Sequence, residues 1–450
     1  MRNKLSIALS GLVLMGFSQQ ALAVDWPSLQ GLEGQKKEKD LKLWGFIQAD
    51  YNYTKGTDLQ AGPFKGQEAA FNRIAPGSST ETFNVRRARL GLRGQFDYNK
   101  INYFLLSEFG NNGITQEGGA QLTDASVTLN HIPGMHIRLG QFKTPGGNEA
   151  MKAIHTFDWN NFTNATDQLL LERFTNEDGS RTKVIGVDPV TLNVIKVPVG
   201  NDLNGPVGAF RDIGIQAFNT FKKGDREFTY AAMLGNGNGI NRTDNDDNKD
   251  FHLLLSTEKV FGGRGPRREG FKTYAWYNKG KRTLDFANGV AGKQEFDRKR
   301  YGVGATYRKG KVRGAAEYIK AKGMIFNGSL GGAIPGAVNA AGAVAPLTYL
   351  TDNKADGYHI DLGYKVTPKV ELGIRYDVLN RGTDSATPAL EREFKTVSLG
   401  AQYSFNPRTR LIANYEFRDA EAPNLPAGAP PNLILDGMDD RVSVQILSVF

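Results

Sequence analysis

The chain of 450 residues contains no cysteine and only five histidines. Without cysteine it can form no disulfide, thiolate metal site or cysteine nucleophile. After residue 23 there is no run of about 18 apolar residues, which argues against membrane-spanning helices. Glycine and proline are too few for a collagen or low-complexity chain, and the 26 Phe and 16 Tyr argue against disorder. The composition predicts a folded protein without long apolar segments.

The first 23 residues predict a secretory signal peptide. Arg2 and Lys4 precede an apolar stretch at 5–17, and residues 21–23 have the small-x-small pattern of a cleavage site. The alternative, a membrane anchor, requires a longer apolar stretch. Removal of Arg2 and Lys4 reduces the 56 basic residues to 54, against 47 acidic ones, for a net charge of +7. Export of a chain without cysteine favours a bacterial envelope.

The rest of the chain alternates apolar and polar residues with a period of two. Apolar residues occupy the even positions of 358–366, with polar residues or glycine between them, and segments 370–378, 397–405 and 411–417 follow the same pattern. Soluble sandwiches also alternate in this way. Three further features are typical of outer-membrane barrels. Short and long connections alternate along the chain, and aromatic residues lie near the strand ends. The chain also ends on a strand, with Phe450 on its apolar face.

This pattern predicts sixteen strands. We expect them to begin near Leu41, Phe83, Ile101, Leu122, His136, Arg211, Glu227, Asp250, Gly270, Asp297, Lys311, Asp356, Val370, Phe394, Thr409 and Asp439. An even number places both ends of the barrel on the periplasmic side, and about sixteen strands leave a water-filled lumen. We therefore predict an all-β transmembrane antiparallel barrel over residues 41–450, preceded by a short periplasmic segment at 24–40.

Basic residues on the polar face of the strands are candidates for an anion path. In segment 83–94 the alternation directs Arg87, Arg89 and Arg93 into the lumen. The same phasing nominates Arg138, Arg298, Arg300, Arg308, Arg313, Arg375 and Arg410. Cations in a narrow passage attract anions, and the guanidinium fork fits phosphate oxygens. Acidic residues are also frequent on this face, so simple pairing of these arginines with carboxylates stays open.

Three segments carry a resemblance to a known family. Residues 83–94, Leu139 to Pro145 and Leu171 to Phe174 together resemble the phosphate-selective porin O and P family. The resemblance extends over essentially the mature chain. It implies a homotrimeric, sixteen-stranded anion channel with loop three, here 144–210, folded into the lumen. In that loop and at its start, Lys143, Lys152 and Arg173 are candidates for the constriction.

The leading hypothesis is a passive outer-membrane diffusion channel for small anions such as phosphate or polyphosphate. The alternatives are a general or organic-solute porin with weak selectivity, and a surface adhesin or scaffold barrel. The histidines are scattered, so we predict no enzyme, catalytic residue, metal site or cofactor.

The expected location is the outer membrane of a Gram-negative bacterium after Sec export. The expected partners are membrane lipid, lipopolysaccharide, small anions, two further copies of the chain and, through Phe450, the outer-membrane assembly machinery, but no nucleic acid. We expect the small residues Ala88, Gly91, Gly302, Gly304 and Ala305 to permit close packing of barrel walls in a trimer. The basic turn at 264–268 is expected to face lipid head groups or solvent.

Overall fold

The computed structural model describes most of the chain. The described residues are 39–74, 79–115, 119–172, 182–187, 194–198, 207–244, 246–263, 265–286, 292–343, 345 and 347–450. The predicted signal peptide, most of segment 24–40 and Arg173 lie outside these ranges. None of the described helices is long and apolar enough to cross a membrane.

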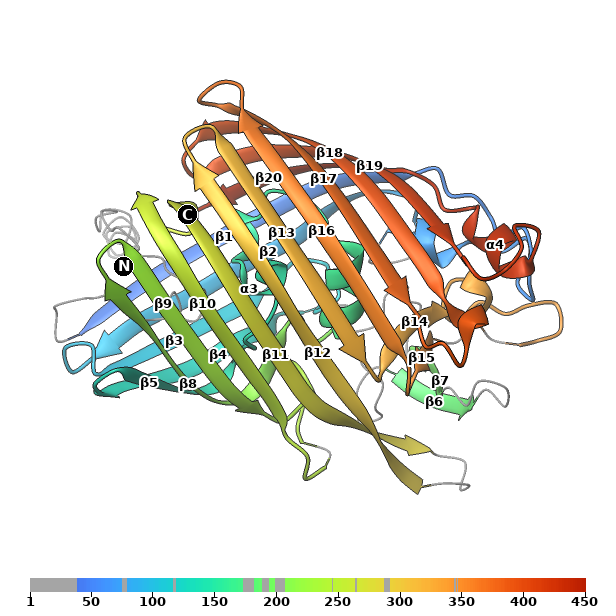
Figure 1. Cartoon of the computed structure of the whole chain (residues 1–450), viewed down its shortest axis with the longest axis horizontal. Helices are drawn as coiled ribbons and strands as arrows, with labels where there is room; N and C mark the ends of the chain where they lie inside the picture. The colour runs from blue at the N-terminus through green and yellow to red at the C-terminus, as the bar shows by residue number, and fades with distance from the viewer. Residues whose placement is uncertain are drawn as a thin grey trace, which may run out of the picture.

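Sixteen antiparallel strands form one closed barrel (Figure 1), which confirms the predicted fold class and strand number. In barrel order the strands are β1 (Asp40–Thr54), β2 (Glu81–Phe96), β3 (Ile101–Glu108), β4 (Gln121–Ile132), β5 (Met135–Lys143), β8 (Arg211–Lys223), β9 (Arg226–Gly235), β10 (Asp250–Gly262), β11 (Glu269–Phe286), β12 (Gly292–Lys309), β13 (Val312–Lys322), β16 (Lys354–Lys365), β17 (Val370–Arg381), β18 (Arg392–Asn406), β19 (Thr409–Glu421) and β20 (Arg441–Val449). Each strand pairs with its neighbours in chain order, and β20 returns to β1.

The last residues of the chain close the barrel. The β1–β20 ladder runs from Phe46 opposite Val449 to Thr54 opposite Arg441. Beyond it, the amides of Gly45 and Phe450 each donate to the other's carbonyl, at 3.0 and 2.9 Å. The Phe450 ring lies on the outer face over Gly45 and is 48% exposed. Only a residue without a Cβ fits at position 45, because a Cβ there would lie 2.6 Å from the ring.

The predicted alternation separates the two faces of the wall. On β16, Tyr358, Ile360 and Leu362 are exposed on the outside, whereas His359 and Asp361 are buried inside. The aromatic residues predicted to form outer girdles are likewise exposed: Tyr358, Tyr364, Tyr376, Tyr403, Phe405 and Phe417. An outer apolar surface and a polar interior are the arrangement that a lipid bilayer imposes on a barrel.

The prediction that Gly302 and Gly304 pack barrel walls against one another is wrong. A Cβ at Gly302 would lie 2.8 Å from the Trp276 indole nitrogen, and one at Gly304 would lie 2.2 Å from the Tyr274 hydroxyl. Trp276 and Tyr274 are buried on the inner face. These glycines therefore make room for large aromatic side chains inside the barrel.

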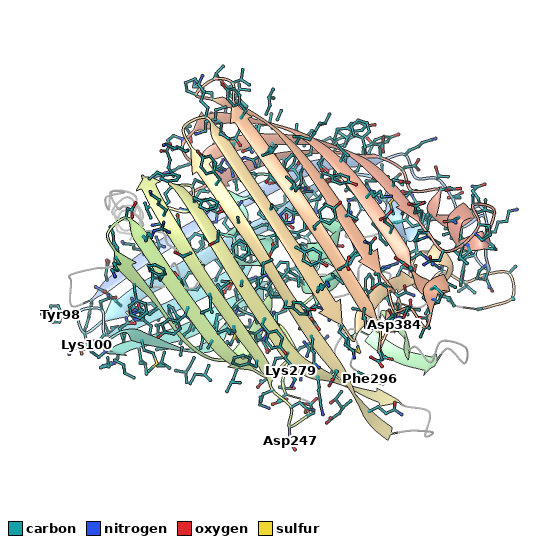
Figure 2. All side chains as sticks on the ribbon, viewed as in Figure 1. Tyr98, Lys100, Asp247, Lys279, Phe296 and Asp384 are labelled. Carbon is teal, nitrogen blue, oxygen red and sulfur yellow. The ribbon has the colours of Figure 1, made fainter. Side chains whose placement is uncertain are left out.

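Short turns and long loops lie at opposite ends of the barrel. Figure 2 shows Tyr98 and Lys100 at the turn end, whereas Asp247 and Asp384 project at the loop end. The helical turns are η1 (Ala70–Asn72), α3 (Asn148–Met151), η2 (Ile154–Thr156), η3 (Thr166–Leu170), η4 (Leu330–Gly332), η5 (Pro388–Leu390) and α4 (Pro430–Leu435). By the topology of outer-membrane barrels, the turn end faces the periplasm.

A second sheet joins two of the long loops. Its strand order is β14 (Ile325–Ser329), β15 (Leu347–Leu350), β7 (Val194–Pro198) and β6 (Thr182–Val187), and it lies at the loop end (Figure 1). Nearby, Leu59, Phe64, Ala69, Ala333 and Ala345 form an apolar cluster that holds two further loop segments together. The outer loops therefore pack against one another around the entrance of the barrel.

Candidate ion path

The first part of loop three, residues 144–172, is folded into the lumen. At its start, Lys143 donates through Nζ to the carbonyls of Ala150 and Lys152 at 2.6 and 2.8 Å. At its end, Arg300 donates to the carbonyl of Leu169 at 3.0 Å. Apolar residues of the loop pack on the inner face of the β8–β13 wall in one cluster, which includes Ala150, Met151, Leu169, Trp276 and Ile319. This packing fills one side of the lumen.

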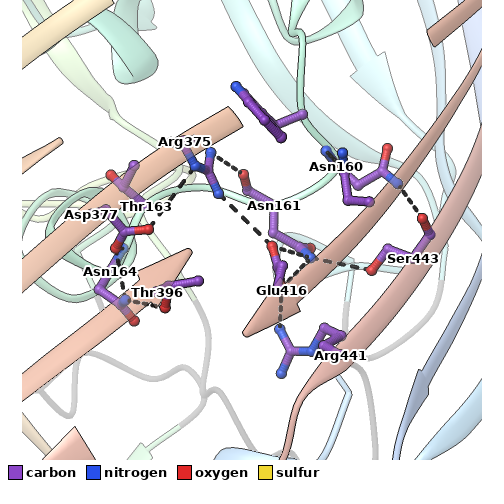
Figure 3. Close-up of polar contacts among 12 residues, drawn as sticks. Asn160, Asn161, Thr163, Asn164, Arg375, Asp377, Thr396, Glu416, Arg441 and Ser443 are labelled. Atoms are coloured by element: carbon purple, nitrogen blue, oxygen red, sulfur yellow. Dashed lines mark hydrogen bonds and ion pairs between the residues drawn. The ribbon is translucent and has the colours of Figure 1, made fainter. Parts of the chain in front are cut away.

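The middle of the loop is fastened to the opposite wall, formed by β17 to β20 (Figure 3). Arg375 donates to the carbonyl of Asn161 at 3.0 Å and lies 3.5 Å from Glu149 and 3.8 Å from Glu416. The Asn164 side chain donates to Asp377 at 2.7 Å. Loop three thus crosses the barrel and is held at both walls.

A β-bulge brings one more arginine to the lumen than simple alternation allows. In the β1–β2 ladder Gln48 faces Arg87 and Ala49 faces Val85, so Arg86 is an extra residue on β2. Both Arg86 and Arg87 therefore point inward. Arg86 donates at 3.0 Å to the Asn160 carbonyl and to the Asn161 side chain, which adds a third attachment for loop three.

A cavity of about 580 Å³ remains on the outer side of loop three. Its charged lining is mainly basic and consists of Arg73, Arg86, Arg87, Arg89, Lys143, Arg211, Arg375, Arg381, Arg392, Arg418 and Arg441, against Glu149, Asp167, Asp377 and Glu416. Four of the eleven cations pair with carboxylates behind the lining: Arg73 with Glu68, Arg86 with Asp50, Arg89 with Glu108 and Arg211 with Asp124. The other seven cations and the four lining carboxylates leave a formal excess of three positive charges. The cavity is therefore a region of positive potential.

Four of these arginines have no carboxylate within ion-pair distance among the described residues: Arg87, Arg381, Arg392 and Arg418. Arg87 donates instead to Gln48 at 3.0 Å, and Arg381 donates to Gln168 at 2.7 Å. Arg392 and Arg418 donate to backbone carbonyls. Their charges are solvated by neutral dipoles and are not neutralised.

The predicted site residues fall into two groups. Arg87, Arg89, Arg375 and Lys143 line the cavity, although Arg89 is paired with Glu108 at 2.7 Å and Lys143 holds loop carbonyls. The others lie outside this cavity. Arg93 faces the lumen nearer the turn end, with its guanidinium 5.9 Å from the Trp44 ring.

Five predicted residues have structural contacts that account for their burial or position. Arg138 is buried between Phe142 and Phe218, at 5.6 and 4.5 Å from their rings. Two others bind acidic residues: Arg298 lies 2.5 Å from Glu172, and Lys152 lies 3.4 Å from Asp158. Arg313 pairs with Asp361 and Glu371. Among the described residues, Arg300 donates its hydrogen bonds to backbone carbonyls.

Comparison with known proteins identifies the family. The model of the Gram-negative porin family matches residues 8–423. The chain belongs to the Gram-negative porin family. No curated protein matches it. Family and closed barrel together support an outer-membrane channel.

Solved structures show the same fold at low sequence identity. A loop L8 deletion mutant of OmpT, an outer membrane protein of Vibrio cholerae, is 10% identical with a TM-score of 0.52, covering 92% of this porin and 100% of that chain. Salmonella typhi OmpF in complex with daunomycin is 15% identical with a TM-score of 0.54, covering 92% and 98%. Both align along nearly the whole barrel.

A second ionic cluster lies in this porin at the turn end, around Asp158 of loop three. Arg267, Arg308 and Lys152 lie 2.8, 3.4 and 3.4 Å from its carboxylate. Burial alone raises the pKa of Asp158, but the surrounding cations outweigh burial and hold the pKa well below its ordinary value. Asp158 therefore stays ionised and binds the cations of this cluster.

The prediction that the basic turn faces lipid head groups or solvent is wrong for two of its arginines. Arg267 binds Asp158 inside the lumen, and Arg268 lies 2.6 Å from both Glu227 and Glu258. Arg264 lies outside the described residues. Carboxylates on neighbouring elements draw both guanidinium groups inward, which sequence position does not reveal.

Several cavity residues were missed by the sequence analysis. Arg381, Arg392, Arg418 and Arg441 continue the lumenal phase of their strands toward the loop end, so extending the alternation to the strand ends would have found them. The inward direction of Arg86 could not be predicted in this way, because the β-bulge that turns it inward forms only when β2 pairs with β1. Among the described residues, no group of three His, Asp or Glu is placed to hold a metal ion.

Proposed function

We propose that this porin is a passive diffusion channel that favours small anions. The observation that carries the proposal is the cavity lining, in which four arginines have no carboxylate partner among the described residues and the paired groups leave a formal excess of three positive charges. Positive charge along a narrow passage raises the local concentration of anions and repels cations.

The order of the basic residues along the barrel supports stepwise passage. Arg381 and Arg418 lie toward the loop end, Arg87 lies deeper, and Arg89 and Lys143 follow at loop three. Several shallow sites in sequence allow an ion to move on without being trapped. The resemblance to the phosphate-selective porins supports phosphate or polyphosphate among the permeant anions.

A weakly selective general porin is the second candidate. It is favoured by the cluster at the turn end, where Asp158, Asp361 and Glu371 offset Arg267 and Arg313. In that part of the lumen Lys152, Arg267, Arg308 and Arg313 are paired with these carboxylates, so the ionic groups there contribute rigidity more than selectivity. The two candidates differ in the sign and size of ion selectivity.

We also propose a homotrimer, on the resemblance to the phosphate-selective porins, and recognition of the chain end by the assembly machinery. The exposed Phe450 ring at the turn end supports the second of these proposals. Export through the Sec pathway rests on the sequence of residues 1–23, and contact with lipopolysaccharide rests on the expected location.

The reversal potential of single channels under a KCl gradient tests the proposal. The wild type should be anion-selective, and Arg381→Gln/Arg418→Gln should weaken that selectivity while retaining polar side chains. One charge about 6 Å from an ion contributes about 0.7 kcal/mol in water, which favours chloride about threefold and disfavours potassium about threefold. We therefore expect an approximately tenfold fall in the chloride-to-potassium permeability ratio per arginine.

The matched control is Lys320→Gln, which removes a positive charge from the outer face of β13. Selectivity should not change in this variant, because Lys320 faces away from the lumen. A wild-type reversal potential near zero would contradict the proposal and leave the general porin.

A further inference from the structure

The cavity that carries the positive charge is also lined by large apolar side chains. They include Phe71, Phe162, Phe210, Phe394, Ile434 and Met438, which come from outer loops, loop three and the barrel wall. A channel for inorganic ions needs polar groups to replace lost water, and apolar walls provide none. The mixture of unneutralised arginines and apolar surface fits a permeant that carries both a negative charge and an apolar body.

One place on the wall combines both features at close range. Arg381 of β17 and Arg392 of β18 face each other directly in the ladder. Like charges in directly opposite positions destabilise a sheet, and neither guanidinium has a carboxylate partner among the described residues. An anion between the two would remove this repulsion.

Apolar surface adjoins this arginine pair. The Phe394 ring lies 4.8 Å from the guanidinium carbon of Arg381, and Phe394 follows Arg392 on the same inner face of β18. Leu390 of η5 packs in the same cluster and also lines the cavity. A ligand whose charged group binds Arg381 and Arg392 would place its body against Phe394 and Leu390.

The combination recurs at loop three, beside Arg89, and on the periplasmic side of the loop, beside Arg93. The guanidinium of Arg89 lies 5.8 Å from the Phe46 ring, and that of Arg93 lies 5.9 Å from the Trp44 ring. His155 of loop three contacts both rings, at centroid distances of 5.3 and 5.8 Å. Guanidinium groups beside aromatic faces therefore occur before and after the loop that narrows the lumen.

We propose that the preferred permeants are organic anions with an apolar body, such as aromatic or alkyl carboxylates; this rests on the proposed anion channel and specifies its substrate class. The carboxylate binds between Arg381 and Arg392, and the apolar body packs on Phe394 and Leu390. Burial of about 60 Å² of apolar surface corresponds to about a tenfold gain in affinity over an anion of equal charge without that surface.

The test compares benzoate, acetate and inorganic phosphate as blockers of the chloride current in planar bilayers. Benzoate should block at a concentration about tenfold below that of acetate, and phosphate should not be the strongest blocker. Phe394→Ala should bring benzoate closer to acetate. The control Phe405→Ala removes a lipid-facing ring from the same strand and should leave the difference intact.

Leu390→Ser is a second variant that should bring the blocking concentration of benzoate closer to that of acetate. Leu390 lies in an outer loop, so its replacement leaves the barrel wall unchanged. Equal block by benzoate and acetate, or strongest block by phosphate, in a channel that is still anion-selective would overturn this inference and leave the anion channel standing. A reversal potential near zero would overturn the anion channel itself, and with it this inference.

Discussion

Arg375 should hold loop three in place, and its replacement should enlarge and destabilise the open channel. Its side chain is 1% exposed, and it lies between Glu149 of the loop and Glu416 of the wall, which are each 6% exposed. It also lies 5.0 Å from the ring of Trp159, another loop residue. Arg375→Met would leave three buried carboxylates, those of Glu149, Asp377 and Glu416, without this cation.

The magnitude follows from that burial. Breaking a buried ion pair by removing one partner costs about 3–5 kcal/mol. The hydrogen bonds that Asn160 and Asn164 make to the wall contribute about 1 kcal/mol each. No single one of them therefore compensates for the loss of the Arg375 ion pairs. We expect the equilibrium constant for release of the loop to rise by about a hundredfold or more.

Single-channel recording measures the effect as higher conductance and greater open-channel noise. The matched control is Arg392→Gln on the neighbouring strand β18, which should alter selectivity and leave the trace quiet, because Arg392 donates to the carbonyls of Ala389 and Glu391 and not to loop three. Arg375→Met/Glu149→Gln should recover part of the wild-type behaviour, since one uncompensated charge is removed. A folded Arg375→Met channel with wild-type conductance and noise would refute the reasoning.

Two further predictions concern loop three and barrel closure. Because the pKa of Asp158 is held well below its ordinary 3.8, its ion pairs are complete above about pH 4 and are lost only as the pH falls through the depressed value. The difference in single-channel noise between the wild type and Asp158→Asn should therefore stay constant from about pH 8 to about pH 4 and shrink below that range, and loss of this difference near pH 6 would contradict the assignment. Gly45→Val should lower the yield of folded barrel, measured by the electrophoretic shift on heating, because its Cβ would lie 2.5 Å from the Arg89 carbonyl oxygen and 2.6 Å from the Phe450 ring. A normal yield would show that the β1–β20 seam tolerates a side chain there.

Local alternation was sufficient to predict the barrel and much of its lumenal face. Strands predicted to begin near Arg211, Val370 and Thr409 begin at those residues, and the sixteen strands close as expected. Each strand's inward and outward positions depend on its own period of two, because one face meets lipid and the other meets water or loop three. That signal alone placed Arg87, Arg89 and Arg375 on the lumenal face, and the structure adds that they line the cavity.

Whether each arginine is paired with a carboxylate depends on residues that are distant in the sequence. Arg375 and Arg381 share a strand and a face, yet Arg375 meets Glu149, 226 residues distant, whereas Arg381 meets neutral groups. Arg313 and Arg267 meet Asp158 only because loop three crosses the lumen. No local pattern encodes such distances across the barrel.

The sequence by itself determined the class of fold, the number of strands and the lumenal phase of most basic residues, because these follow from alternation along each strand. The tertiary structure alone decided which arginines are neutralised and which remain as positive charge beside apolar surface. It also decided the inward turn of Arg86, because a bulge exists only in the pairing of β2 with β1.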